Sequence, residues 1–288
     1  MAGEVLEGEP SGRRDYTAEE VRAARSVLIE LTHLLSDYSA GIVVVGGWVP
    51  YFTIPQGSSP HEGTKDVDVA LSPALIGKEG YKSMGEILLS ALYQQDPKKP
   101  FRYYRSVPME ERRVSVIVDF LTGENEGQGE NGRLQEVQDL MASTMHGCDV
   151  AFVDPIPMEL TGEHPGGGRD TVTVKVASLP SFLVMKGLAL HNRGGEDGRK
   201  DAYDIYYCLK NVPGGLETLA DRFAPYLSHP VVQESLLKIA AKFKTLEHIG
   251  PRFVADRGDD EEEREFLRRD AFEQVSDLLK LLGVTSPS

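Results

Sequence analysis

The sequence IVVVGG at residues 42–47, followed by TKDVDV at residues 64–69, decides the fold of this chain. The first segment is an apolar β-strand that ends in two glycines, and glycines leave a backbone open enough for a phosphate group to approach closely. In the second segment Asp66 and Asp68 are two residues apart on a predicted strand, so both carboxylates point to the same face. Hard divalent cations prefer carboxylate oxygens as ligands. Together the two segments predict a site for a metal ion and a triphosphate.

The order of these features resembles the signature of the nucleotidyltransferase superfamily, hG[GS] followed by Dh[DE]h, which occurs on the DNA polymerase β-like fold. The resemblance implies an α+β fold in which helices flank a mixed β-sheet. It also implies that Gly46 and Gly47 hold the phosphates of a nucleoside triphosphate. By the same resemblance, Asp66 and Asp68 are expected to bind magnesium or manganese and to take part in catalysis.

The two residues directly before the aspartates, Thr64 and Lys65, are further candidates for nucleotide binding. Many relatives carry an arginine four residues before the first aspartate, whereas this chain has Glu62 there. The contribution of that arginine is therefore expected either to come from another residue, such as Lys65, or to be absent.

A second segment makes the resemblance more specific, because it matches one branch of the superfamily. Lys186 on a predicted helix, followed by RKDAYDIY at residues 199–206, is similar to the Lys…KDxYDxY region of the AbiEii-like branch, which includes toxins of toxin–antitoxin pairs. The resemblance implies catalytic roles for Lys186 and Asp204, and nucleotide binding by Lys186 and Asp201. Two alternatives remain open: the Lys186 head reaches water while its stem packs on apolar neighbours, and Asp204 pairs with Lys200 one turn earlier.

Residues 114–120 alternate in the manner of a β-strand and place Asp119 near its end. The superfamily often takes a third metal-binding carboxylate from such a strand. The resemblance therefore implies that Asp119 is a catalytic residue and a third metal ligand. The alternative is an aspartate at the end of a strand that only faces water.

The most basic stretch of the chain is residues 98–113. It contains six cations and three aromatic residues: Lys98, Lys99, Arg102, Arg105, Arg112 and Arg113, with Phe101, Tyr103 and Tyr104. One interpretation is a hairpin that faces RNA or a nucleotide, with arginines on phosphates and aromatic rings on bases. The other, more common arrangement is a solvated pair of antiparallel edge strands.

The composition is that of an ordinary globular protein, with 288 residues of which 40% are hydrophobic. The net charge of -14 argues against a broad surface for nucleic acid, so any contact with RNA is expected to be local. Cys148 and Cys208 are far apart and lack partners at metal-ligand spacing, which is typical of reduced intracellular thiols. Without a signal-like N-terminus or a membrane-length apolar run, the chain is expected to be cytoplasmic.

The pattern along the chain predicts three parts. Residues 1–16 are acidic and lack periodicity, as in a flexible tail. Residues 17–177 carry the strand signals and form the predicted α/β nucleotidyltransferase domain. At its start, Thr17 and Glu20 form a predicted capping box for a helix expected over residues 18–36. After residue 177 only helical patterns follow, which predicts a helical domain over residues 178–288, with the active site in the cleft between the two domains.

The resemblance implies a metal-dependent enzyme that moves a nucleoside monophosphate from a nucleoside triphosphate to an acceptor hydroxyl. By resemblance the acceptor is the 3′ end of a tRNA, although a protein or a small molecule fits the residues equally well. The toxin branch also implies a cognate antitoxin partner. The alternative function is an inactive nucleotidyltransferase fold that senses a nucleotide or binds a protein: Glu62 favours it, while Asp66, Asp68 and Lys186 argue against it.

Overall fold

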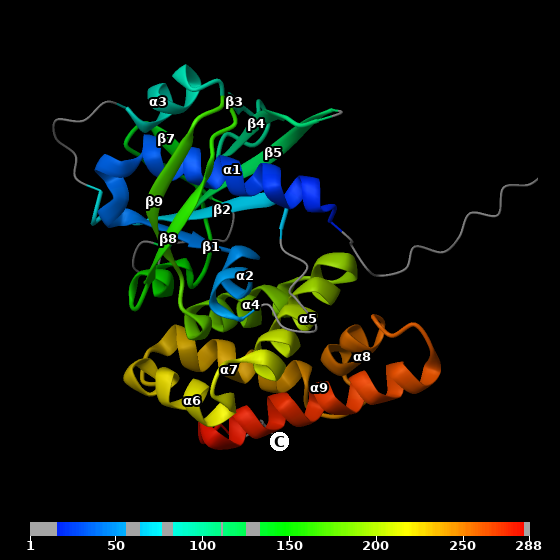
Figure 1. Cartoon of the computed structure of the whole chain (residues 1–288). Helices are drawn as coiled ribbons and strands as arrows, with labels where there is room; N and C mark the ends of the chain where they lie inside the picture. The colour runs from blue at the N-terminus through cyan, green and yellow to red at the C-terminus, as the bar shows by residue number, and fades with distance from the viewer. Residues whose placement is uncertain (1–15, 56–63, 77–82, 111, 125–132, 285–288) are drawn as a thin grey trace, which may run out of the picture.

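The computed structural model describes residues 16–55, 64–76, 83–110, 112–124 and 133–284 (Figure 1). The predicted N-terminal tail, apart from Tyr16, lies outside these residues, and so does Glu62. A mixed β-sheet makes up one half of the molecule and a group of helices the other, which confirms the predicted α+β class.

Within the described residues the sheet has the strand order β3-β4-β5-β2-β1-β9-β8, with β7 beside β5 and β6 beside β7. Its strands are β1 (Ile42–Val45), β2 (Asp66–Leu71), β3 (Gln94–Gln95), β4 (Arg102–Pro108), β5 (Arg113–Thr122), β6 (Leu134–Val137), β7 (Leu140–Thr144), β8 (Ile156–Glu163) and β9 (Arg169–Val176). The central strands β2 and β5 run parallel, whereas β1 is antiparallel to β2 and β4 is antiparallel to β5.

Three helices precede or interrupt the strands: α1 (Ala18–Leu34), α2 (Trp48–Thr53) and α3 (Met84–Ser90). The helical half contains α4 (Leu179–Asn192), α5 (Gly195–Asn211), α6 (Gly215–Phe223), α7 (Pro230–Lys242), α8 (Ile249–Ala255) and α9 (Glu261–Leu281). Short 3-10 turns lie at η1 (Ser36–Gly41), η2 (Cys148–Phe152) and η3 (Ala224–Tyr226). No helix in the described part of the chain is both long enough and apolar enough to cross a membrane.

Helix α1 begins at a capping box that the sequence predicts. The Glu20 backbone N–H donates to Thr17 Oγ1 at 3.2 Å, and the Thr17 N–H donates to Glu20 Oε2 at 3.0 Å. The apolar stripe of the helix is buried against the sheet, over which α1 lies in Figure 1. The helix ends at Leu34, two residues before the predicted end at Ser36.

A buried ion pair ties strand β4 to α1. Arg105 Nε donates to Glu30 Oε2 at 2.8 Å, and Arg105 Nη2 donates to Glu30 Oε1 at 2.9 Å. The Arg105 side chain is only 8% exposed, so it does not face an RNA, and that interpretation of the hairpin is wrong for this residue. Tyr103, on the same face of β4, is also buried.

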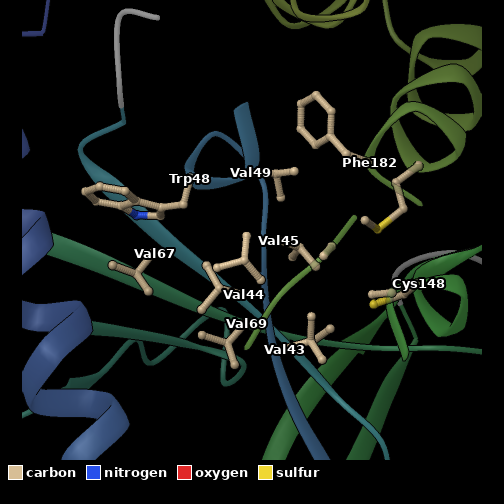
Figure 2. Close-up of a cluster of buried hydrophobic side chains, with 14 of the residues drawn as sticks. Val43, Val44, Val45, Trp48, Val49, Val67, Val69, Cys148 and Phe182 are labelled. Carbon is tan, nitrogen blue, oxygen red and sulfur yellow. The ribbon is translucent and has the colours of Figure 1, made fainter. Parts of the chain in front are cut away.

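Helix α4 joins the two halves. It is buried on almost every side, and it packs on α5 and α7 of the helical half and on α2 and η2 of the sheet half. In Figure 2 the ring of Phe182, from α4, lies beside Val49 of α2, and the cluster continues to Val45 of β1 and Cys148 of η2. These side chains belong to one buried cluster that continues from the sheet into the helices, so α4 is held in a fixed position against the end of β1.

Candidate active site

A cleft with a volume of about 660 Å³ lies where the sheet meets α4 and α5. This size falls within the range of small-molecule sites. The side chains and backbone that line it include most of the predicted site residues, namely Gly46, Gly47, Asp66, Asp68, Asp119, Lys186 and Asp201. The structure therefore brings together residues that are up to 155 positions apart in the sequence.

Strand pairing aligns the acidic side chains of the cleft in one row. Asp68 of β2 lies opposite Asp119 of β5 in the parallel pair, and Asp119 lies opposite Arg102 of β4 in the antiparallel pair. Asp66 is two residues before Asp68 on the same strand, so its side chain leaves from the same face. The register thus places three carboxylates from two strands side by side.

Burial and neighbouring charges shift the pKa values of Asp68 and Asp66. Burial raises the pKa of Asp68 to about 6, and the negative charges of Asp119 and Asp66 act in the same direction. Burial also raises the pKa of Asp66, although the positive charges of Lys65 and Lys200 oppose the change. Raised values of this kind mean that the ionised aspartates lack sufficient positive charge around them.

Gly46 brings its backbone close to this acidic row. Its φ angle is +68°, and a Cβ atom at this position would lie 2.1 Å from Asp68 Oδ2. Only glycine meets both conditions without strain. Gly47 follows it directly before α2 and also lines the cleft.

Thr64 and Lys65 are not among the residues that line the cleft. Thr64 is buried and its Oγ1 lies 3.3 Å from both the N and the O of Asp66, so it fixes the start of β2. Trp48 Nε1 donates to the same Asp66 carbonyl at 3.0 Å. Lys65 is exposed and places its ammonium 5.8 Å from the centre of the Tyr16 ring. Nucleotide binding by Thr64 and Lys65 stays a prediction.

Lys186 is held between two buried aspartates. Its Nζ lies 2.7 Å from Asp201 Oδ1 and 2.7 Å from Asp204 Oδ2, and 5.4 Å from the centre of the Phe182 ring. Burial lowers the pKa of Lys186, but the charges of the two aspartates outweigh this effect, so the net pKa is raised and the ammonium is charged. The head of Lys186 therefore does not extend into bulk water, and the second alternative, an Asp204–Lys200 pair, is not what the structure shows.

Several cleft residues were not singled out from the sequence as site residues. They are Tyr16, His146, Arg193 and Lys200. Lys200 Nζ donates to the Tyr16 hydroxyl at 3.4 Å, and Arg193 Nη1 lies 3.4 Å from Asp201 Oδ2. His146 lies between Glu124 and Glu234, with its ring nitrogens at 2.8 and 2.9 Å from their carboxylates. These pairs join separate elements, so no local sequence pattern indicates them.

The donor set at Asp66 and Asp68 is suited to a hard divalent cation, because it consists of carboxylate oxygens whose pKa values are raised by burial, which the nearby cations do not offset. Within the described residues, no three His, Cys, Asp or Glu side chains are arranged to hold a metal ion as they stand. The nearby Asp119 directs both of its oxygens at Arg102 instead.

Comparisons with known proteins agree with this geometry. A model of the family described as "Nucleotidyl transferase AbiEii toxin, Type IV TA system" matches residues 103–277, which is more than half of the chain. The matched part includes Asp119, Lys186, Asp201 and Asp204, and it begins after the glycine and aspartate segments. Searches of curated proteins and of solved structures gave no match. The chain therefore belongs to the AbiEii family of nucleotidyltransferase toxins of type IV toxin–antitoxin systems.

Proposed function

We propose that this nucleotidyltransferase moves a nucleoside monophosphate from a nucleoside triphosphate to an acceptor hydroxyl, with magnesium or manganese bound by Asp66 and Asp68. One observation carries the proposal: the two aspartates of β2, the open backbone at Gly46 and the charged Lys186 line the same cleft. A bound divalent cation supplies charge stabilisation at the reacting phosphate and at the leaving pyrophosphate.

The protein groups bind and orient the triphosphate. The backbone at Gly46 lies next to the acids with no side chain in the way, so phosphate oxygens can approach it. Lys186 donates one of its three N–H groups to Asp201 and forms an ion pair with Asp204, so it keeps a donor for a phosphate oxygen. Asp201 and Asp204 thus act as positioning residues that keep the ammonium at the wall of the cleft.

In the reaction the oxygen of the acceptor hydroxyl attacks the α-phosphorus atom. The bond between that phosphorus and the oxygen that bridges to the β-phosphate breaks, and pyrophosphate leaves with the electron pair. The hydroxyl proton passes to a carboxylate of the cleft or to water. Asp119 is our candidate for this carboxylate and for a third metal ligand, because it lies opposite Asp68 in the sheet. The rate gain comes from position and charge.

For the acceptor we propose the 3′ end of a tRNA. The support is that cations gather around the cleft of an otherwise acidic protein: Lys99, Arg102, Arg193 and Lys200 all line it. Such a local group of cations can hold a phosphate backbone. We propose a cognate antitoxin as the protein partner, because the family consists of toxins of type IV toxin–antitoxin systems. We also propose that the reaction takes place in the cytoplasm, where tRNA and nucleotides are present.

The experiment that tests the proposal compares binding with turnover. We expect nucleoside triphosphates to raise the melting temperature only when magnesium or manganese is present, and pyrophosphate to be released once cell RNA is added. Stabilisation without any pyrophosphate release, across all four triphosphates and with a full cell extract as acceptor, supports the alternative of a nucleotide-sensing module instead.

A further inference from the structure

Arg102 and Asp119 form a two-point ion pair inside the cleft. Arg102 Nε donates to Asp119 Oδ1 and Arg102 Nη2 donates to Asp119 Oδ2, both at 2.7 Å. The hydrogen bonds to Asp119 raise the pKa of Arg102 further, so the guanidinium is charged. Both residues line the cleft, beside Asp68.

The neighbouring strand pair offers a direct comparison. Arg105 lies three residues after Arg102 on β4 and makes the same kind of two-point pair with Glu30. That second pair is closed off beneath α1, with side chains 8% and 11% exposed, whereas the Arg102 and Asp119 side chains are 23% and 15% exposed. Side chains three apart on a strand point to opposite faces, so one pair serves the core and the other faces the cleft.

The position of Arg102 in the cleft allows it to replace Asp119 with another hydrogen-bonding partner. The guanidinium uses two of its five N–H groups on Asp119, and it remains charged at any ordinary pH. A divalent cation that enters beside Asp68 repels this positive charge and competes for the oxygens of Asp119. A triphosphate in the same cleft offers the guanidinium oxygens of matching geometry.

We propose that Arg102 alternates between two partners: it neutralises Asp119 while the cleft holds no metal or nucleotide, and it binds the triphosphate when Asp119 turns to the metal. This inference rests on the proposed function. It gives Arg102 the role that the resemblance implies for an arginine four residues before the first aspartate, a position that Glu62 occupies in this chain. It also accounts for the two hydrogen bonds that Asp119 accepts from Arg102 inside the cleft.

The proposal makes two predictions of opposite sign for Arg102→Gln. Without nucleotide, the variant should bind Mn²⁺ more tightly than the wild type, because a competing cation has gone; the Mn²⁺ concentration at the midpoint of the thermal stabilisation curve should fall severalfold. With saturating Mn²⁺, the same variant should bind a non-hydrolysable nucleoside triphosphate about tenfold more weakly, as expected for the loss of a charged hydrogen-bonding partner.

Two further variants complete the test. Arg112→Gln is the matched control, because Arg112 is an exposed cation of the same hairpin that pairs with Glu19 and does not line the cleft. It should change neither midpoint. Arg102→Lys keeps the charge and serves if Arg102→Gln does not fold; it should weaken nucleotide binding, because an ammonium cannot make the two-point contact.

If the Mn²⁺ midpoint is unchanged in Arg102→Gln, Arg102 does not compete with the metal ion. If the nucleotide affinity is unchanged, Arg102 does not exchange Asp119 for the triphosphate. Weaker binding of Mn²⁺ also contradicts the proposal, since it means that Arg102 supports the acids instead of competing with a cation. If the wild type itself binds neither Mn²⁺ nor nucleotide, the proposed function has failed. If the wild type binds both and the variant behaves as the wild type does, only this inference has failed.

Discussion

The carboxylate of Asp68 lies directly beside the backbone of Gly46, where a Cβ atom would stand 2.1 Å from Oδ2. Gly46 directly follows β1 and Asp68 lies on β2, and the antiparallel register of these two strands pairs Val45 with Asp68. The glycine of the first motif and the aspartate of the second are thus close together, so the proposed phosphate and cation would share one small space.

Gly46→Ala should therefore abolish nucleotide binding while the chain still folds. The methyl group has to displace the Asp68 carboxylate, and alanine at a φ of +68° costs roughly 1–3 kcal/mol of stability. Binding of a nucleoside triphosphate by calorimetry measures the first effect and urea unfolding the second. Gly166→Ala is a control, because no atom lies within 4 Å of the Cβ position at Gly166 and its φ is not positive. Nucleotide affinity at the wild-type level in Gly46→Ala would contradict the site.

Asp68→Asn should stabilise the metal-free protein at neutral pH. The pKa of Asp68 rises from 3.8 to about 6, so between these values the folded chain holds more protons than the unfolded chain, and stability falls as the pH rises. The asparagine removes this cost, which is at most about 3 kcal/mol and less where water in the cleft screens the charge.

The measurement is urea unfolding of the wild type and of Asp68→Asn, in the presence of a metal chelator, between pH 4 and pH 7.5. The advantage of the variant should grow with pH and reach a plateau above pH 6. An advantage that does not depend on pH, or a variant less stable than the wild type at pH 7.5, would show that Asp68 is not an uncompensated acid.

Lys186→Ala should destabilise the fold by roughly 3–5 kcal/mol, because it removes the cation that lies between two buried aspartates. Loss of activity in this variant alone therefore does not identify a phosphate-binding lysine. The triple variant Lys186→Ala, Asp201→Asn, Asp204→Asn removes the uncompensated charges and should recover most of the stability, but not nucleotide affinity. A triple variant that binds nucleotide as tightly as the wild type would remove Lys186 from the site.

The basic hairpin separates into a structural and a functional part. Arg105→Gln should lower stability by roughly 3–5 kcal/mol, because Glu30 is left buried and unpaired. Lys99→Gln, at the cleft, should leave stability unchanged and lower RNA affinity, with a salt dependence that is less steep by about one unit. Filter binding to cell RNA between about 50 and 200 mM salt checks this. RNA affinity that responds to neither salt nor Lys99 would favour a protein or small-molecule acceptor.

Local patterns in the sequence predicted the local structure well. The Thr17–Glu20 capping box fixes the start of α1, and the two motifs fix β1 and the acidic strand β2, because each depends on residues a few positions apart. The recognised AbiEii branch is confirmed by the family match.

Pairings between distant elements were not predictable in this way. The partner of Arg105 is 75 residues away, and that of Arg102 is 17 residues away across a hairpin whose register the sequence leaves open. The period of the strand does indicate that Arg102 and Arg105 face opposite sides, and this signal could have separated the two arginines. The aspartates that hold Lys186 come from the next helix, so only the packing of α4 on α5 reveals their contact.

The most direct test of the central claim is transfer of label from an α-³²P nucleoside triphosphate in cell extract, measured with pyrophosphate release for the wild type and for Asp68→Asn. The wild type should label an acceptor and release pyrophosphate only with magnesium or manganese. Asp68→Asn should do neither, although it is folded and at least as stable. Transfer at the wild-type rate by Asp68→Asn would contradict the assignment of Asp68 to the active site.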